Sequence, residues 1–128
     1  MKKLTSIAIQ FGIGLALLPS LALAASRGKT VTMNGFVLDS ACAFVKDLKK
    51  PTSPECAVAC AKAGSPLVIL AEDGTLYWPI SGSMPAKSQN DRLLPFAGKH
   101  VSVEGEILEK GGSRAIIIAK IKESGAHQ

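Results

Sequence analysis

The last third of the chain has the clearest alternation of apolar and polar positions. Over residues 100–107, apolar side chains fall on one face and polar side chains on the other, as in a β-strand with one buried face. Gly105 interrupts the alternation and favours a β-bulge there. After a glycine-rich turn, the apolar run 115–121 predicts a final strand. The apolar positions on the buried face of the first of these strands are Val101, Val103 and Ile107.

Three earlier segments, residues 30–39, 67–71 and 76–80, also have the β-branched and apolar composition of strands. Gly35 lies in the middle of the first segment, where a bulge or a sharp coil would be tolerated. An Asp-Gly dipeptide separates the other two segments and predicts a hairpin. Five strands with glycines at coiling points predict an all-β fold, a five-stranded OB-like barrel. A five-stranded meander packed against one helix is the alternative.

One short helix is predicted between the first and second strands, over residues 54–63. Ser53 is a suitable N-cap, Pro54 suits the first helical position, and a glycine and a proline after the helix supply a stop. Residues 81–92 contain turn formers and few large apolar residues, so a loop is expected, closed by a small apolar segment at 93–96. The expected core residues are Val37, Val68, Ile69, Val101, Val103, Ile107 and Ile117.

Residues 1–24 are typical of a cleavable export signal. Lys2 and Lys3 form a positive start, an apolar run follows over residues 7–18, and the small-x-small cleavage site ends at Ala24. The apolar run is about 12 residues long, shorter than the roughly 20 residues that cross a bilayer, so a membrane-spanning anchor is not expected. The short, lysine-led signal is typical of bacteria and predicts a periplasmic, or else a secreted, protein.

Cleavage there leaves residues 25–128 as a single OB-like domain, with an ordered core expected at about 30–123. A chain of about one hundred residues can bury one modest core, which excludes a large multi-domain enzyme. The formal net charge of the whole chain is +5; without the two lysines of the signal, 13 basic residues against 10 acidic residues leave +3. The basic residues Lys46, Lys49 and Lys50 gather in one loop rather than along a stripe, so a nucleic-acid partner is not expected.

Three stretches carry further motifs. Gly35 to Cys42 includes an Asp-x-x-Cys sequence, Cys56 to Leu67 includes a Cys-x-x-x-Cys sequence, and Gly98 to Gly105 leads through a turn into Ile116 to Ile121. Together they resemble an uncharacterised family of small exported bacterial OB-fold proteins, over most of residues 33–121. The resemblance implies export and an OB-like barrel, and it implies no particular activity. The usual OB helix lies between strands three and four, whereas the helix predicted here lies between strands one and two.

Cys42, Cys56 and Cys60 are the only cysteines, and they lie within nineteen positions. Cys56 and Cys60, at i and i+4, share one face of the predicted helix, while Cys42 approaches from the end of the first strand. Three converging sulfurs suit a soft metal ion, Cu(I) or Zn(II). Asp39, or His100 if the barrel brings it close, could complete a tetrahedral set of ligands. The cysteines are therefore the best candidates for metal or redox chemistry.

A structural disulfide is the competing interpretation of the same cysteines. Exported proteins meet oxidising conditions, and a bridge stabilises a small domain by roughly 2–4 kcal/mol. The two helical cysteines make a poor pair, because their side chains are badly directed for a bridge. Cys42 would then pair with Cys60 or with Cys56, and a Cys42–Cys60 disulfide would leave Cys56 unpaired. Buried, inert thiols are a third interpretation.

Tyr77 and Trp78 are adjacent on a predicted strand, so one of them must face away from the barrel core. An exposed ring on such a sheet could stack on a sugar or a base, which makes both residues candidates for ligand binding. Packing of the outer ring under the helix or under the 81–92 loop is the alternative.

Motifs of catalysis are absent from the sequence, so enzymatic activity is not expected. There is no Ser-His-Asp order, His-Glu-x-x-His, P-loop or dinucleotide-binding glycine pattern. His127 lies in a polar tail, where a functional role is not expected. Two classes of function remain. One is a non-catalytic exported OB-like module whose cysteine cluster could bind a soft metal ion, and the other is a disulfide-stapled module that binds a protein or a small ligand.

Overall fold

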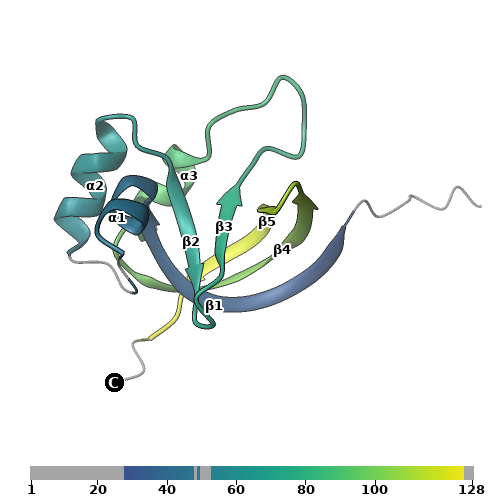
Figure 1. The fold of residues 1–128 in the computed structure, drawn as a ribbon, viewed down its shortest axis with the longest axis horizontal. Helices are drawn as coiled ribbons and strands as arrows, with labels where there is room; N and C mark the ends of the chain where they lie inside the picture. The colour runs from purple at the N-terminus through teal and green to yellow at the C-terminus, as the bar shows by residue number, and fades with distance from the viewer. Residues whose placement is uncertain (1–27, 48, 50–52, 126–128) are drawn as a thin grey trace, which may run out of the picture.

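The computed structural model describes residues 28–47, 49 and 53–125 (Figure 1). This part of the chain forms a closed barrel of five strands, as predicted, and the strand order around the barrel is β1-β2-β3-β5-β4. The barrel is consistent with the OB-like prediction. The predicted export signal and His127 lie outside the described residues. The strands are β1 (Lys29–Asp39), β2 (Leu67–Ala71), β3 (Leu76–Pro79), β4 (His100–Lys110) and β5 (Ser113–Glu123).

β1 is a long, strongly curved strand that pairs antiparallel with β2 and with β4 (Figure 1). The two pairings overlap at Gly35, which lies opposite Ala71 of β2 and opposite Val101 of β4. The register is unbroken on both sides, so the bulge that the sequence allows at Gly35 is not formed. The glycine instead allows β1 to lie close to β2, because a Cβ at this position would lie 2.4 Å from the carbonyl oxygen of Leu70.

β5 closes the barrel by pairing antiparallel with β4 and, over two residues, parallel with β3. The register between β4 and β5 shifts between Glu104 and Gly105, which confirms the bulge predicted there. β2 and β3 form the predicted hairpin. In its turn, Gly74 has a positive φ of 84°, and the Asp73 carboxylate accepts a hydrogen bond from the Thr75 backbone N–H at 2.9 Å.

Two helices lie between β1 and β2: α1 (Ser40–Val45) and α2 (Pro54–Lys62). α2 confirms the predicted helix, whereas α1 was not expected from the sequence. Two further short elements, α3 (Asn90–Leu93) and a 3-10 helix (Leu94–Phe96), replace the end of the predicted 81–92 loop and the apolar segment after it. Among the residues that the structure describes, no helix is long and apolar enough to cross a membrane.

The barrel interior holds the main hydrophobic cluster, which α2 and α3 help to cover. Three of the residues predicted for the core lie outside this buried cluster. Ile117 is only partly buried, because β5 turns its neighbours inward and leaves Ile117 beside Gly82 of the β3–α3 loop. Ile107, beyond the bulge, is also partly buried, and Val68 is buried in a second cluster. The buried members of the main cluster are Val37, Ala57, Ala61, Leu67, Ile69, Leu93, Ala97, Val101, Val103, Ile116 and Ile118.

A second cluster, called the outer cluster here, lies on the opposite face of β1 and β2 from the barrel interior. Alternation along the strands explains it, since Val37 and Ile69 point inward while their neighbours point outward. α1 packs on this face through Ala43. The outer cluster consists of buried Leu38, Val68 and Leu70 with partly buried Phe36, Ala43, Leu76 and Trp78.

Candidate metal centre

The three cysteines come together at the helices between β1 and β2. Cys42 lies on α1 and is buried, while Cys56 and Cys60 lie on α2 and are partly buried. Their sulfur atoms all lie within 4.8 Å of one another, and all three residues are free thiols. The structure thus confirms the predicted cysteine cluster, and it contains no disulfide between Cys42 and Cys60 among the described residues.

Two similar helix caps position the cluster. The backbone N–H of Cys42 donates to Oδ1 of Asp39 at 3.0 Å, and the backbone N–H of Cys56 donates to Oγ of Ser53 at 3.1 Å. Asp39 and Ser53 are the N-caps of α1 and α2, so each of these cysteines is the third residue of its helix. Cys60 follows one turn later on α2. Asp39 is a favoured N-cap residue, and it is the one local signal for α1 in the sequence.

The surroundings of the cluster raise the pKa of two of its thiols, Cys42 and Cys60. A hydrogen bond from the Cys42 thiol to Asp39, together with burial and the negative charge of Asp39, raises the pKa of Cys42 from 9.0 to about 11. Burial, followed by the charge of Asp39 and the proximity of Cys56, also raises the pKa of Cys60. At neutral pH both Cys42 and Cys60 therefore carry their protons.

Asp39 lies beside the cluster as a hydrogen-bond acceptor. It is 2% exposed, and its Oδ1 also accepts a hydrogen bond from Oγ of Ser65 at 3.3 Å. Burial opposes its ionisation, but the hydrogen bonds from Cys42 and Ser65 outweigh burial and hold the pKa of Asp39 below its ordinary value. Sequence reasoning proposed Asp39 as a fourth ligand, and the structure gives it a second task in capping α1 and holding the Cys42 thiol.

His100, the other proposed fourth ligand, makes its contacts elsewhere. Its Nδ1 lies 2.6 Å from Oγ of Ser124, and its Nε2 lies 2.9 Å from Oε1 of Glu72. Its ring also makes an edge contact with Phe36, at 4.8 Å between ring centroids. In the described part of the chain, the group of side chains that could converge on a metal ion contains the three cysteines, and it includes neither His100 nor Asp39.

The separation of the sulfurs matches a metal site better than a formed bridge. An ion bound at about 2.3 Å to each sulfur would hold the sulfurs roughly 3.8–4.0 Å apart, so shifts of under about 1 Å would assemble the site. A disulfide needs a sulfur separation of about 2.05 Å. The sulfur separations are thus close to those of a three-thiolate metal site.

Tyr77 and Trp78 face opposite sides of the barrel wall. Tyr77 packs against the main cluster in the interior, and Trp78 packs against the outer cluster. Trp78 also stacks on Phe44 of α1, with ring centroids 6.2 Å apart and an interplanar angle of 20°. The outer ring therefore packs against a helix, but this helix is α1, which the sequence did not predict, rather than the predicted helix at residues 54–63.

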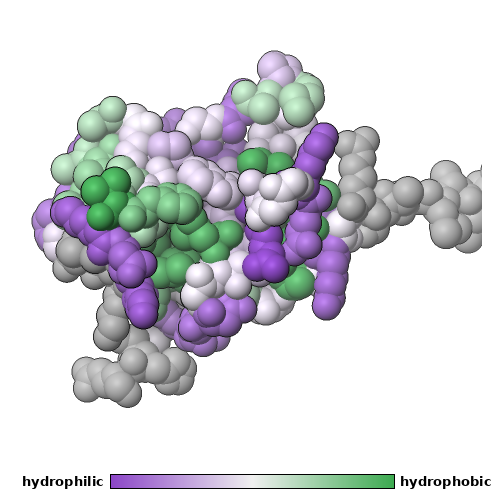
Figure 2. Space-filling model, in the orientation of Figure 1, coloured by the Kyte–Doolittle hydropathy of each residue, from purple (hydrophilic) through white to green (hydrophobic). Residues whose placement is uncertain are grey.

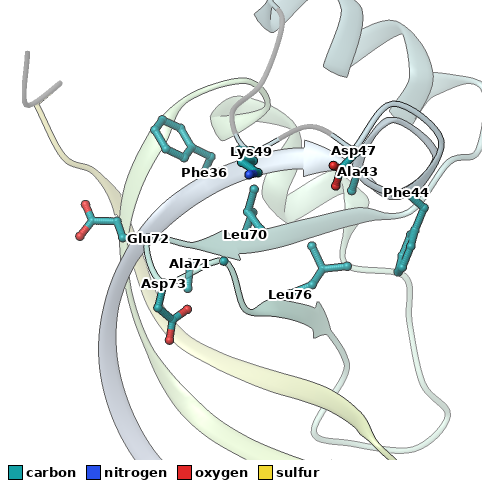
Figure 3. Close-up of a pocket in the computed structure, with 11 residues that line it drawn as sticks. Phe36, Ala43, Phe44, Asp47, Lys49, Leu70, Ala71, Glu72, Asp73 and Leu76 are labelled. Atoms are coloured by element: carbon teal, nitrogen blue, oxygen red, sulfur yellow. The ribbon is translucent and has the colours of Figure 1, made fainter.

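A groove of about 590 Å³ next to α1 was missed by sequence reasoning (Figure 3). Its apolar lining comes from β1, β2, β3 and α1, which are far apart in the sequence, so no local motif marks it. The alternation of β1 and β2 could have predicted outward-facing apolar residues, but not the helix that lies against them. The residues that line the groove include Phe36, Phe44, Leu70, Leu76, Glu72 and Asp73.

Comparisons with protein-family models, curated proteins and solved structures find no match to this chain. The functional interpretation therefore rests on the geometry and chemistry of its own residues. Of these, the cluster of three thiols carries the most specific chemistry.

Proposed function

We propose that the chain is an exported OB-like module that binds one soft metal ion, Cu(I) or Zn(II), through Cys42, Cys56 and Cys60. The observation that carries this proposal is the convergence of three sulfurs, from two separate helices, to within 4.8 Å of one another. Export to the periplasm rests on the predicted signal at residues 1–24. The OB-like assignment is supported by the closed five-stranded barrel.

Binding would exchange thiol protons for the metal ion. Thiolates are the ligands, so the protons of Cys42 and Cys60, whose pKa values are raised, must leave when the ion binds. Affinity is therefore expected to rise with pH, and binding should release protons into the solvent. When the thiol proton of Cys42 is lost, Asp39 still accepts hydrogen bonds from the Cys42 backbone N–H and from the Ser65 hydroxyl. It would orient Cys42 in either metal complex, and it could supply an oxygen ligand to four-coordinate Zn(II).

The alternative function is a disulfide-stapled module that binds a protein or a small ligand. The same proximity of the sulfurs supports it, since Cys42 could be oxidised with Cys60 or with Cys56 after modest shifts. In that case one helical cysteine would be dispensable. The metal site therefore requires all three cysteines, whereas the disulfide-stapled module requires only two.

Metal titration of the reduced protein under anaerobic conditions tests the proposal. We expect one Cu(I) or Zn(II) ion per chain by elemental analysis, with protection of all three thiols from iodoacetamide. Changing any one cysteine to Ser should weaken binding by more than the roughly 10- to 100-fold that loss of an outer-shell partner costs. Met84→Leu is the matched control, because it removes an exposed sulfur donor in the β3–α3 loop and should leave binding unchanged.

Other outcomes distinguish the alternatives. One disulfide in the isolated protein, with no bound metal after reduction and with stability dependent on only two cysteines, would establish the stapled module instead. Three thiols that are alkylated independently, without metal binding in the reduced state, would refute both functions.

A further inference from the structure

A second candidate site lies in the groove next to α1, away from the sulfurs. α1 contributes to both places: Cys42 belongs to the thiol cluster, whereas Phe44 lines the groove. Leu70 of β2 and Leu76 of β3 form the apolar floor, and Figure 3 shows Phe36 and Phe44 on opposite sides of these two leucines. The groove is thus a hollow with an apolar floor and an aromatic ring at each side.

The apolar surface around the groove is open to solvent. Phe44 is 66% exposed, and its neighbour Val45 is 84% exposed. Figure 2 shows apolar residues gathered over α1 and the adjoining strands, with hydrophilic residues along the edge of this patch. An exposed apolar patch that is hollowed and rimmed by polar groups is typical of a binding surface.

Charge at the rim indicates what kind of ligand would fit. Among the residues that the structure describes, three carboxylates, of Asp47, Glu72 and Asp73, line the groove against one cation, that of Lys49. Figure 3 shows Glu72 and Asp73 together at the hairpin end, apart from Asp47. Glu72 contacts His100 at 2.9 Å, whereas Asp73 accepts a hydrogen bond within its own turn and lies within electrostatic range of Arg114. The hairpin end therefore presents negative charge directly beside the apolar floor.

We propose that this groove binds a small organic cation with an apolar, aromatic body. The body would lie on Leu70 and Leu76 between the two phenylalanine rings, and the ammonium group would lie next to Asp73. A volume of about 590 Å³ is in the range of small-molecule sites. The excess of carboxylates disfavours an anion, and the aromatic rings at both sides suit an apolar, aromatic body between them. This inference is independent of metal binding at the cysteines.

Three probes that share one body and differ in the head group test the charge requirement. They are 4-phenylbutylamine, 4-phenylbutan-1-ol and 4-phenylbutanoate, each titrated into the reduced full chain. Trp78, the only tryptophan, stacks on Phe44 and should report binding by a change in fluorescence. Backbone amide shifts of Leu70 and Leu76 in NMR spectra should locate the bound probe. We expect the amine to bind about threefold to fivefold more tightly than the alcohol, and the carboxylate to bind most weakly.

Two variants with matched controls test the proposed contacts, with NMR shifts as the readout. Phe44→Ala should weaken amine binding by about fivefold, because an aromatic contact is lost. Val45→Ala, at the next position on α1, which is also exposed but does not line the groove, should leave binding unchanged. Asp73→Asn keeps an oxygen that can accept the Thr75 hydrogen bond but removes the charge, so it should abolish the preference for the amine over the alcohol. Glu123→Gln removes a carboxylate outside the groove and should preserve that preference.

Several results would overturn the proposal. Equal binding of all three probes would show a non-specific apolar surface. Failure of all three to bind would exclude the proposed ligand class. If the chain instead self-associates with increasing concentration and Phe44→Ala abolishes that association, the patch is a protein interface. None of these experiments involves a metal ion or the cysteines. A negative result for the groove would therefore leave the proposed metal function untouched, and the reverse also holds.

Discussion

Asp39 connects the local structure of β1 and α1 to the chemistry of the cluster. It ends β1, caps α1 through the Cys42 backbone N–H, and accepts the hydrogen bond of the Cys42 thiol. Capping α1 and accepting the thiol hydrogen bond need an oxygen acceptor, whereas the electrostatic destabilisation of the Cys42 thiolate depends on the negative charge of Asp39. An amide side chain of the same shape can therefore separate structure from electrostatics.

Asp39→Asn is predicted to lower the pKa of Cys42. The amide oxygen still caps α1, but the negative charge that opposes the thiolate is gone. The measurement is the pH dependence of iodoacetamide alkylation in a chain with Cys56→Ser and Cys60→Ser, so that only Cys42 reacts. The reaction should accelerate at a lower pH in the Asp39→Asn chain. Asp91→Asn, at an exposed position on α3, should leave the profile unchanged, and an unchanged profile for Asp39→Asn would contradict the assigned role.

The same pKa shift predicts how stability depends on pH. Because folding raises the pKa of Cys42 from 9.0 to about 11, this thiol contributes stability that is fully present below pH 9. The contribution is lost as the pH rises toward 11, since the unfolded chain releases the proton first. Urea unfolding of the reduced, metal-free protein should show a decline over this interval that is smaller for Asp39→Asn. Comparing the two chains cancels the titration of lysines and tyrosine in the same range.

At the scale of single residues, the sequence was informative about which side chains meet and less so about their surroundings. Cys56 and Cys60 had to share a helix face, and the end of β1 had to bring Cys42 near them. The raised pKa of Cys42 depends on burial and on contacts made after folding. Similarly, the consecutive isoleucines 116–118 do not show which of them face inward, because register is set by pairing with β4 across the bulge.

Among the secondary-structure elements, α2 is fixed at its far end by Asn90 of α3. Oδ1 of Asn90 accepts from the backbone N–H of Leu67 at 2.9 Å, and Nδ2 donates to the carbonyls of Ser65 at 2.9 Å and Ala61 at 3.4 Å. This side chain therefore joins the end of α2, the start of β2 and α3. It holds the helix that carries two of the three thiols.

Asn90→Ala is predicted to destabilise the domain by roughly 2 kcal/mol, because it leaves a backbone donor and two carbonyls of partly buried segments without this partner. The decrease should be visible in the midpoint of urea unfolding. Gln89→Ala is the control, since its side chain donates only to the carbonyl of Lys87 at an exposed position and its loss should cost under about 0.5 kcal/mol. Equal midpoints for the two variants would mean that Asn90 does not hold these elements together.

The helices show which elements local signals can predict. α2 has a cap, a proline in its first turn and an acidic residue near its start, and it was predicted within one residue of its observed end. α1 has only six residues, too few for a helical period, and α3 has four and no side-chain cap. Such short helices form because packing against the barrel stabilises them, and that packing is not visible in a local pattern.

At the scale of the whole molecule, the number of strands could be predicted but their order around the barrel could not. Hairpin pairing of β2 with β3 and the turn between β4 and β5 are local. Closure depends on β1 pairing with β4 and on a parallel contact of two residues between β3 and β5. These contacts join segments that are distant in sequence, so composition and periodicity give no direct signal for them.

The overlap of two strand pairings at Gly35 makes barrel closure sensitive to a single methyl group. Where the new Cβ meets no neighbouring atom and the backbone conformation suits alanine, Gly→Ala stabilises a protein by about 0.4–1 kcal/mol, because it restricts the unfolded chain. At Gly35 the new Cβ would lie 2.4 Å from the Leu70 carbonyl oxygen and 2.9 Å from Cα of Ala71, and backbone paired on both sides cannot move freely. Gly35→Ala is therefore predicted to destabilise the domain by at least about 2 kcal/mol.

Two further glycines provide a graded comparison for this prediction, measured by urea unfolding. Gly82→Ala would meet the flexible side chain of Ile117 at 3.1 Å, so its cost should be smaller than that of Gly35→Ala. Gly125→Ala has nothing within 4 Å among the described residues and should change stability by less than about 0.5 kcal/mol. If all three variants were equally stable, the close approach of β1 to β2 would not exist in solution. The barrel would then have to close in another register, because the contact at Gly35 is fixed by the pairing of β1 with both of its neighbours.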